Sequence, residues 1–284
     1  MKNLVQDLLE HLKLERLDEN LFRGSSQNMG LPNVYGGQVL GQALSAASQT
    51  VEGRRAHSLH AYFLRPGDKS LPIDYEVDRI RDGQSYSTRR IVAVQHGRPI
   101  FNMSASFKVE EQGLEHQFEM PAVPDPEGLA NTMQLTRQEQ DNLPDRLFRF
   151  LTRQRPIELR PVQPTHPLTP EVRPPFRAMW LRACAGLPDD PAMHKILLAY
   201  ASDFTLLGTA LLPHALSFAQ GTVRAASLDH AMWFHRDFRM DDWLLYAMDS
   251  PSASDGRGLG RGSIFSRDGR LVASVVQEGM IRRI

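Results

Sequence analysis

Asp203 is the one acid in the apolar stretch ASDFTLLGTALLPH, residues 201–214, and is the first candidate for a chemical role. The apolar residues around it recur at helical spacing, so Asp203 lies within a helix or at a break in one. Asp is favoured at the N-cap of a helix, where the helix dipole would lower its carboxyl pKa. Capping leaves acid–base catalysis open as a second role for the same carboxylate.

Gln277 is a second polar side chain in an apolar setting. It lies in RLVASVVQEGMI, residues 270–281, which has the composition of a strand. Strand alternation places Gln277 on the same face as Val275 and the apolar residues before it. A buried amide needs hydrogen-bond partners, so Gln277 is either a structural residue or part of a site.

Ser227 begins a third candidate segment, within RAASLDHAMWF, residues 224–234. If this strand is regular, Ser227 and Asp229 point to one face and His230 points to the other. No G-x-S-x-G motif surrounds a serine in this chain, so a serine nucleophile is unsupported. A role for the Ser227 hydroxyl in orienting a water molecule stays open.

Metal and thiol chemistry are weaker alternatives. Asp229, His230, His235 and Asp237 are close in sequence, but their spacing matches no H-E-x-x-H or other specific zinc motif. Cys184 is the single cysteine, which excludes an internal disulfide and a cysteine-cluster zinc site. We therefore expect no metal and no cofactor.

The elements that must position these residues form an internal repeat. Three segments of the first half resemble three of the second half in the same order and at a nearly constant offset. The matched positions are Gly41 and Gly208, His60 and His230, and Gly97 and Gly269. Two copies of one fold with small loop insertions would produce this pattern.

Each copy has the same expected order of elements: a strand, a long helix and then several strands. The first helix is expected to begin near Gly36, and a longer helical stretch is expected from Ala192 to Leu212 in the second copy. The repeat alignment matches the start of the first helix with Ser202-Asp203, inside that stretch. The Asp268-Gly269 pair indicates a hairpin between the last two strands. A helix against an antiparallel sheet, repeated, is an α+β architecture.

Composition limits the function classes. The chain has 284 residues, of which 41% are hydrophobic and 23% charged, and 33 basic side chains balance 33 acidic ones. A formal charge of zero provides no overall field toward nucleic acid or an anionic membrane. The N-terminal segment is an amphipathic helix by its leucine spacing rather than a signal peptide, and we expect no membrane span and a cytoplasmic location.

Several segments together resemble the acyl-CoA thioesterase II family of the TesB type. In chain order they are VYGGQVLGQAL, HSLHAYFLRPGD, YASD, LDHAMWFHRDF, WLLY and ASVVQEG. The resemblance implies a double hot dog fold, two tandem repeats that each wrap an antiparallel sheet around one long helix. It assigns residues 1–115 to an N-terminal hot-dog domain, 116–155 to a connector and 156–284 to a C-terminal hot-dog domain that carries the catalytic residues.

The resemblance also implies a function, the hydrolysis of acyl-CoA to free fatty acid and CoA. By motif position Asp203 is the general base, while Ser227 and Gln277 hold the attacking water. Bacterial members often have Thr at the position of Ser227, and the hydroxyl is kept here. The implied substrate is a medium- to long-chain acyl-CoA in fatty acid metabolism, and the implied assembly is a homo-oligomer, either dimer or tetramer.

Other details and functions stay open at this stage. Backbone N–H groups near Gly36-Gly37 or beside Asp203 are candidate oxyanion donors, and Arg65 or Arg236 could meet coenzyme A phosphates. A hot-dog hydratase or dehydratase on acyl thioesters would need a His/Asp pair, and Asp203 has no adjacent histidine in the sequence. A non-catalytic acyl-CoA-binding regulatory module is the alternative from another class, because fold does not determine function.

Overall fold

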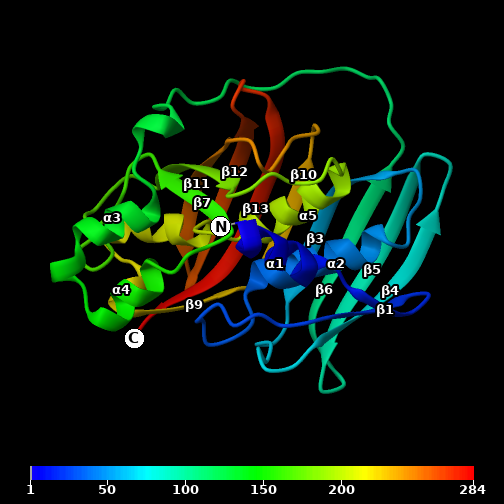
Figure 1. The fold of residues 1–284 in the computed structure, drawn as a ribbon, viewed down its shortest axis with the longest axis horizontal. Coiled ribbons are helices and arrows are strands. Elements are labelled where there is room, and N and C mark those ends of the chain that lie inside the picture. The colour runs from blue at the N-terminus through cyan, green and yellow to red at the C-terminus, as the bar shows by residue number, and fades with distance from the viewer. Residues whose placement is uncertain (1) are drawn as a thin grey trace.

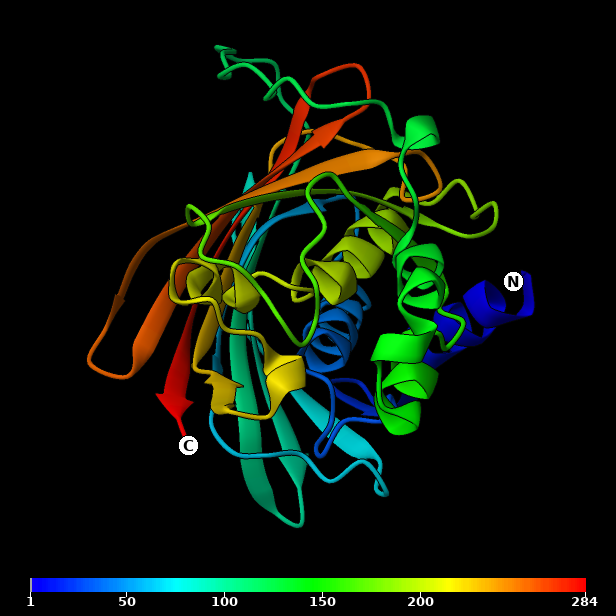
Figure 2. The ribbon, with the colours of Figure 1, turned by 90° about the vertical axis from the view of Figure 1, so that its left-hand side faces the viewer.

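One antiparallel sheet of 13 strands curves around two central helices, α2 (Gly36–Ser48) and α5 (Pro191–Ser202), in the computed structural model, which describes residues 2–284. Figures 1 and 2 show the sheet on one side of the helix pair. The strand order is β1-β2-β4-β5-β6-β3-β10-β13-β12-β11-β8-β7, and β9 pairs separately with β13.

The strands of the first half precede residue 109, and those of the second half follow residue 156. The first set is β1 (Glu15–Asp18), β2 (Leu21–Gly24), β3 (Arg55–Phe63), β4 (Ile73–Asp82), β5 (Tyr86–Gln95) and β6 (Arg98–Lys108). The second set is β7 (Ile157–Pro161), β8 (Phe176–Ala183), β9 (Val223–Ser227), β10 (Asp229–Phe234), β11 (Leu244–Ser254), β12 (Arg257–Ser266) and β13 (Leu271–Arg283). The remaining helical segments are α1 (Lys2–Leu12), α3 (Thr132–Gln138), α4 (Asp145–Leu151), η1 (Pro126–Gly128), η2 (Gln140–Asn142), η3 (Leu207–His214) and η4 (Phe218–Gln220).

The sheet has the internal symmetry that the repeat predicts. Read from its two edges, the order β1-β2-β4-β5-β6-β3 corresponds to β7-β8-β11-β12-β13-β10, and the halves join where β3 pairs with β10. The hairpin expected at Asp268-Gly269 joins β12 to β13, with Gly269 at φ +86°. Two of the three matched segments therefore lie on equivalent strands.

The third match was wrong. Gly41 lies in α2, but Gly208 lies in the 3-10 helix η3 and not in α5, which is the helix that packs against α2. The single helix expected from Ala192 to Leu212 is also interrupted: α5 ends at Ser202, and Thr205 has φ +62° before η3 begins. A β-branched residue in the left-handed region cannot continue an α-helix.

The two central helices run antiparallel and touch through glycines. A Cβ atom on Gly37 would lie 2.2 Å from the carbonyl oxygen of Tyr200, and one on Gly41 would lie 3.3 Å from that of Ile196. The start of α2 thus meets the end of α5, because only glycine lets the two backbones approach this closely. This crossing determines which groups surround Asp203.

The core lies between the concave face of the sheet and the helices. Apolar side chains of α2 and α5 are buried against it, among them Leu40, Leu44, Leu197 and Leu198. Together α5 and η3 form the one described helical stretch, Pro191–His214, with the length and hydropathy of a membrane span; 78% of its most apolar window is buried inside the protein. Core helices commonly have this composition.

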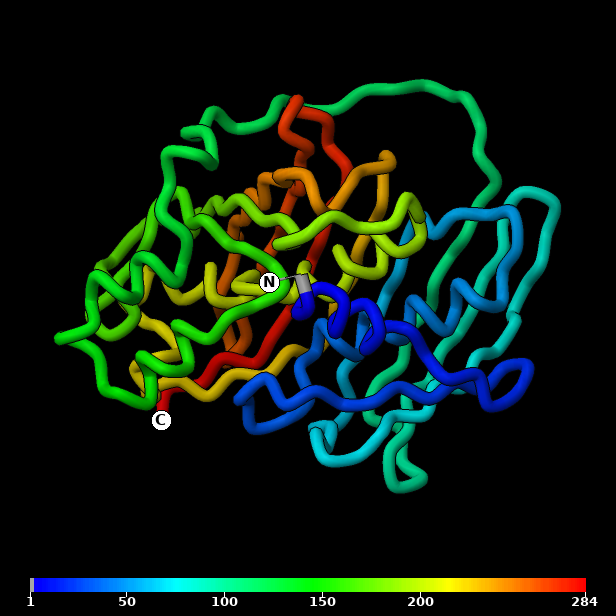
Figure 3. Tube along the Cα trace, viewed as in Figure 1, coloured from blue at the N-terminus to red at the C-terminus, as the bar shows by residue number. Residues whose placement is uncertain are grey.

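The segment between the two sets of strands contains no strand within the described residues. Its first part, residues 109–125, crosses the top of the molecule in Figure 3. Gln117 holds this part against the β12–β13 turn, because the Gln117 side-chain amide donates to the Gly269 carbonyl and accepts from the Leu271 N–H. Its second part forms α3 and α4, which contact each other and lie at the end of the molecule near β7, away from the central helices (Figure 1).

Candidate active site

Asp203 lies at the junction of the two central helices. It is the C-cap residue of α5, so the sequence-based prediction of an N-cap on its own helix was wrong. Its Oδ2 instead accepts a hydrogen bond from the backbone N–H of Gly37, 3.0 Å away, at the start of α2 in the other half. The carboxylate therefore caps the partner helix, which the antiparallel crossing brings to it.

Gln277 connects Asp203 to Ser227. The Gln277 side chain on β13 is fully buried, and its Nε2 donates to Asp203 Oδ1 at 2.8 Å and to Ser227 Oγ at 2.9 Å. The opposite amide orientation would put an oxygen against the carboxylate, so the orientation is determined chemically. The structure thus brings together all three residues singled out from the sequence.

Ser227 faces the interior because the chain is irregular at Leu228. Strand β9 ends at Ser227 and β10 begins at Asp229, and both Ser227 and the fully buried His230 point to the helix side. Regular alternation, which put these two residues on opposite faces, was therefore the wrong assumption. The Asp229 carboxylate fills the irregularity by accepting from the Glu278 N–H at 2.7 Å.

Buried hydroxyl and imidazole groups hold the last turn of α5. The hydroxyl of Tyr35 donates to the Tyr200 carbonyl at 3.0 Å, and that of Tyr246 donates to the Ser202 carbonyl at 2.8 Å. These carbonyls lie at a helix end, where intrahelical donors are lacking. His230 Nε2 lies 2.9 Å from Ser202 Oγ, and burial lowers the pKa of His230 to about 3, so it is neutral.

Sequence reasoning missed Tyr35, Tyr246 and His230 as supports for Asp203. Tyr35 directly precedes the Gly36-Gly37 start of α2, which is the one local signal that could have indicated it. Tyr246 and His230 come from separate strands of the second half and lie in two of the segments that carry the family resemblance, WLLY and LDHAMWFHRDF, but neither segment indicates a contact with α5. Their role arises from the contact between the sheet and α5.

Burial determines the ionisation of Asp203. It raises the pKa of the carboxyl to about 6, against the opposing effect of the hydrogen bonds from Gln277 and Gly37. The hydrogen bond from the start of α2 lowers this pKa, as expected for a helix cap, but desolvation of the charged form is the larger effect and the net shift is upward. A carboxylate with this pKa is ionised at neutral pH and is a stronger base than an exposed aspartate.

A cavity of about 350 Å³ opens beside these groups. Its wall includes Asp203, Ser227, Gly36 and the apolar side chains of Val34 and Leu207. Gly36 is the first residue of α2, so its N–H has no intrahelical acceptor and is available to a ligand. The cavity therefore combines a base, a hydroxyl and a backbone donor next to apolar surface.

The residues proposed for coenzyme A phosphates do not line this cavity. Arg65 donates to the Pro99 carbonyl, and Arg236 donates to the Leu271 carbonyl. Arg177 of β8 lies nearer, with its guanidinium 3.5 Å from the position of a Cβ on Gly208. Burial lowers the pKa of Arg177, and the nearby Arg173 lowers it further.

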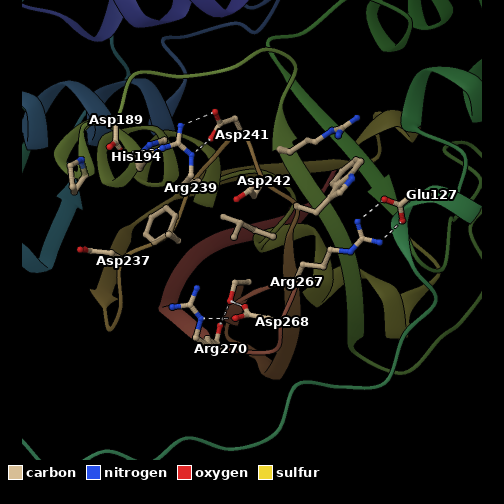
Figure 4. A pocket seen from close by; sticks show the side chains of 16 residues that line it. Glu127, Asp189, His194, Asp237, Arg239, Asp241, Asp242, Arg267, Asp268 and Arg270 are labelled. Carbon is tan, nitrogen blue, oxygen red and sulfur yellow. Dashed lines mark hydrogen bonds and ion pairs between the residues drawn. The ribbon is translucent and has the colours of Figure 1, made fainter.

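Another cavity, about 780 Å³, lies at the other end of α5 and is strongly charged (Figure 4). Its arginines already pair with carboxylates. The pairs are Arg267 with Glu127, Arg239 with Asp241, Arg270 with Asp268, and Arg182 with Glu158. Because these charges are neutralised within the protein, the cavity is a poorer candidate than the one beside Asp203.

The four residues considered for metal binding have separate partners. Asp237 pairs with Arg55 and Lys195, and His235 Nε2 lies 2.9 Å from Ser274 Oγ. His230 contacts Ser202, and Asp229 accepts from the Glu278 N–H. Within residues 2–284, no group of three or more His, Cys, Asp or Glu side chains is placed to hold a metal ion.

Replacing Ser227 tests the value of its hydroxyl. Ser227→Ala is expected to lower kcat for the thioester hydrolysis that the family resemblance implies roughly tenfold to hundredfold, because a hydrogen bond in a charged network contributes about 1.5–3 kcal/mol. Ser227→Thr keeps the hydroxyl and should retain most of the rate. Steady-state kinetics of both variants measures this; equal losses in Ala and Thr would contradict a role for the hydroxyl.

A sheet wrapped around two antiparallel central helices, built from two equivalent halves, defines a double hot dog protein. Residues 149–280 match the acyl-CoA thioesterase family, and residues 24–108 match the acyl-CoA thioesterase N-terminal domain. The chain belongs to the acyl-CoA thioesterase family, of the thioesterase II or TesB type, and is a thioester hydrolase.

Similarity to individual proteins extends over nearly the full chain. Acyl-CoA thioesterase 2 of Haemophilus influenzae is 42% identical over 283 residues, which cover 99% of both chains. The crystal structure of acyl-CoA thioesterase II TesB2 from Mycobacterium marinum is 43% identical with a TM-score of 0.79, covering 97% of this chain and 98% of that one. A hot-dog protein from Alicyclobacillus acidocaldarius, 19% identical with a TM-score of 0.78 and covering 96% and 97% of the two chains, supports the fold alone. The predicted α+β double hot dog fold is confirmed.

Proposed function

We propose that this protein hydrolyses acyl-CoA to a free fatty acid and CoA, with Asp203 as general base and with Ser227 and Gln277 as the residues that position the water. The observation that carries the proposal is the Gln277 amide, which donates to both Asp203 and Ser227 at the wall of one cavity. Its two hydrogens are used in this way, so the remaining lone pairs of the carboxylate and the hydroxyl proton of Ser227 are left for water and substrate.

In the first step, water donates a hydrogen bond to the Asp203 carboxylate and attacks the thioester carbonyl carbon. Asp203 takes the proton as the carbon–oxygen bond forms, and the carbonyl oxygen becomes an oxyanion. The tetrahedral intermediate then collapses, the carbon–sulfur bond breaks, and the proton on Asp203 is returned to the CoA thiolate. No covalent enzyme intermediate is needed, because water is the nucleophile.

The oxyanion needs a donor that is already in place. The Gly36 N–H at the start of α2 lines the same cavity as Asp203 and has no intrahelical acceptor. The positive end of the helix dipole adds to its effect on developing negative charge. We propose Gly36 N–H as this donor, while the adjacent Gly37 N–H holds Asp203.

The direct test is release of CoA thiol from a series of acyl-CoA esters, from short to long chains. Turnover by the purified protein supports the enzyme. Tight binding of acyl-CoA without release of thiol would overturn it in favour of a binding module. A hydratase would instead change the acyl chain, which mass spectrometry of the products detects.

The pH dependence should report Asp203. Because burial raises its pKa to about 6, the base is ionised above that pH and protonated below it. We expect kcat/KM to be level near pH 7–8 and to fall about tenfold per unit below pH 6, as titration of one essential base requires. A rate that stays constant down to pH 4.5 in a folded protein would contradict this assignment.

The proposal also covers the setting of the enzyme. We propose a cytoplasmic homo-oligomer that acts in fatty acid metabolism on medium- to long-chain acyl-CoA. We further propose that residues 1–115 and 156–284 are the two hot-dog domains and that 116–155 is a connector. The absence of strands between Lys108 and Ile157 within the described residues supports this division.

A further inference from the structure

A third cavity lies between the segment that joins the two halves and strand β8. It has a volume of about 380 Å³, and we call it the connector cavity. Leu135 of α3, Leu143 just before α4 and Leu151 of α4 line one side, and Met179 of β8 lines the other. Leu135 and Leu151 line the cavity and are only half-buried. An apolar wall left partly uncovered in this way suits an apolar ligand.

The connector cavity adjoins the cavity of Asp203. Thr205 is the one residue that lines both, and it lies two residues after Asp203 in the sequence. Its hydroxyl is 3.7 Å from the Sδ of Met179, which also lines the connector cavity, and 3.6 Å from Met248 Sδ. A chain that passes Thr205 therefore moves from the site of the base into apolar surroundings.

Thr205 has an unusual backbone, with φ +62°. A β-branched residue rarely adopts the left-handed region, and such strain persists where the surrounding structure requires it. The conformation ends α5 sharply after Asp203 and turns the chain into η3. This turn keeps the helix from continuing across the boundary between the two cavities.

We propose that the connector cavity holds the acyl chain of the substrate and that the leucines of α3 and α4 determine which chain lengths are accepted. This inference rests on the proposed thioesterase function. With the thioester at Asp203, the acyl chain would enter the connector cavity past Thr205, which lines both cavities, and the coenzyme would extend the other way. The anionic coenzyme stays in water, and the apolar chain gains by leaving it.

The connector also contacts the loop that directly precedes the wall of the Asp203 cavity. Arg153, just after α4, donates to the Asn28 carbonyl at 3.1 Å, and a Cβ on Gly30 would lie 3.2 Å from the Phe150 ring. The neighbouring residues 31–36 line the Asp203 cavity. One segment thus supports the loop at the thioester and forms a wall of the chain pocket.

The rival interpretation is that the connector cavity holds part of the coenzyme. Arg177 also lines this cavity, and a cation there could attract a phosphate. The two interpretations differ in what they predict for the acyl chain. A chain pocket makes affinity depend on chain length, whereas a coenzyme pocket affects every CoA ester equally.

The test fills the cavity from the connector. Leu135→Trp on α3 is compared with Arg137→Trp, an exposed position on the same helix. We expect Leu135→Trp to lower the ratio of kcat/KM for hexadecanoyl-CoA to that for butanoyl-CoA at least tenfold, since one methylene in an apolar pocket is worth about 10–200-fold. Arg137→Trp should keep the wild-type ratio. Leu151→Trp provides a second variant if the first does not fold.

A binding measurement separates this inference from the proposed function. S-alkyl-CoA thioethers cannot be hydrolysed, and their affinity for the wild type should rise with alkyl length in calorimetry. Leu135→Trp should remove that dependence. If the wild type hydrolyses esters but Leu135→Trp and Leu151→Trp keep the wild-type dependence of kcat/KM on chain length, the chain pocket is wrong and the thioesterase stands. The same conclusion follows if these variants weaken the binding of free CoA as much as the binding of the thioethers. If the wild type hydrolyses no ester, but its affinity for thioethers rises with alkyl length and Leu135→Trp removes that rise, the thioesterase fails and the pocket stands.

Discussion

Asp203→Asn is expected to lower kcat about a thousandfold, the middle of the range for loss of a general base, while the protein stays folded. The substitution keeps the shape of the side chain and removes its ability to take a proton. In Asn an NH2 group also replaces one of the two carboxylate oxygens that now accept from Gln277 and Gly37, so one of these two hydrogen bonds is lost. Release of CoA thiol at saturating substrate measures the effect.

The control is Asp190→Asn, the same chemical change at the opposite end of the same helix. Asp190 is the N-cap of α5 and accepts from the Ala192 N–H at 2.9 Å. Asn is an equally good N-cap, so this variant should match the wild type in rate and stability. If Asp203→Asn keeps more than a tenth of the wild-type kcat, Asp203 is not the base.

Stability provides a second readout for Asp203. Its folded pKa, about 6, lies above the value of 3.8 for an exposed carboxyl, so the folded state holds the proton more tightly. Between those two values, stability from this group therefore falls as pH rises, and the loss is complete above pH 6. Asp203→Asn lacks this dependence, so its unfolding midpoint should drop less than that of the wild type between pH 5 and pH 7.

Gly37→Ala is expected to destabilise the protein by about 3 kcal/mol, the upper part of the range for overpacking a close contact. The new Cβ would lie 2.2 Å from the Tyr200 carbonyl oxygen and 2.5 Å from the Tyr35 ring. Backbone cannot move aside as a flexible side chain can, so α2 and α5 must separate. The higher helix propensity of alanine, about 1 kcal/mol, offsets only part of this.

Gly113→Ala is the matched control, because a Cβ at Gly113 meets no atom within 4 Å. Denaturant unfolding compares the two variants with the wild type. Gly37→Ala should also lower kcat, because the Gly37 N–H is one of the groups that hold Asp203. Equal midpoints for Gly37→Ala and Gly113→Ala would show that the helices do not depend on this close contact.

The fold was largely predictable from local patterns. Alternation in residues 270–281 placed Gln277 with Val275 on the buried face, and Asp268-Gly269 predicted the last hairpin; both agree with the structure. The repeat predicted two equivalent halves because strand and hairpin patterns depend on neighbouring residues. The match of Gly41 with Gly208 failed because α2 and η3, although similar in sequence, occupy positions in the two halves that are not equivalent.

The site was less predictable, since its geometry depends on contacts between distant segments. Asp203 was expected to cap its own helix, yet it caps α2, because two glycines let the antiparallel helices meet. Ser227 was expected to face away from His230, but the irregularity at Leu228 turns both inward. Neither outcome follows from residues adjacent in sequence.

The sequence by itself determined the polar residue types, an acid, a hydroxyl and an amide in apolar surroundings, and the two-copy α+β organisation. Only the tertiary structure decided that Gln277 bridges Asp203 and Ser227, that burial raises the Asp203 pKa to about 6, and that Thr205 separates two cavities. The physical reason is range. Side-chain periodicity depends on the next few residues, whereas hydrogen bonding, desolvation and cavity shape depend on segments that meet only after the two halves have packed together.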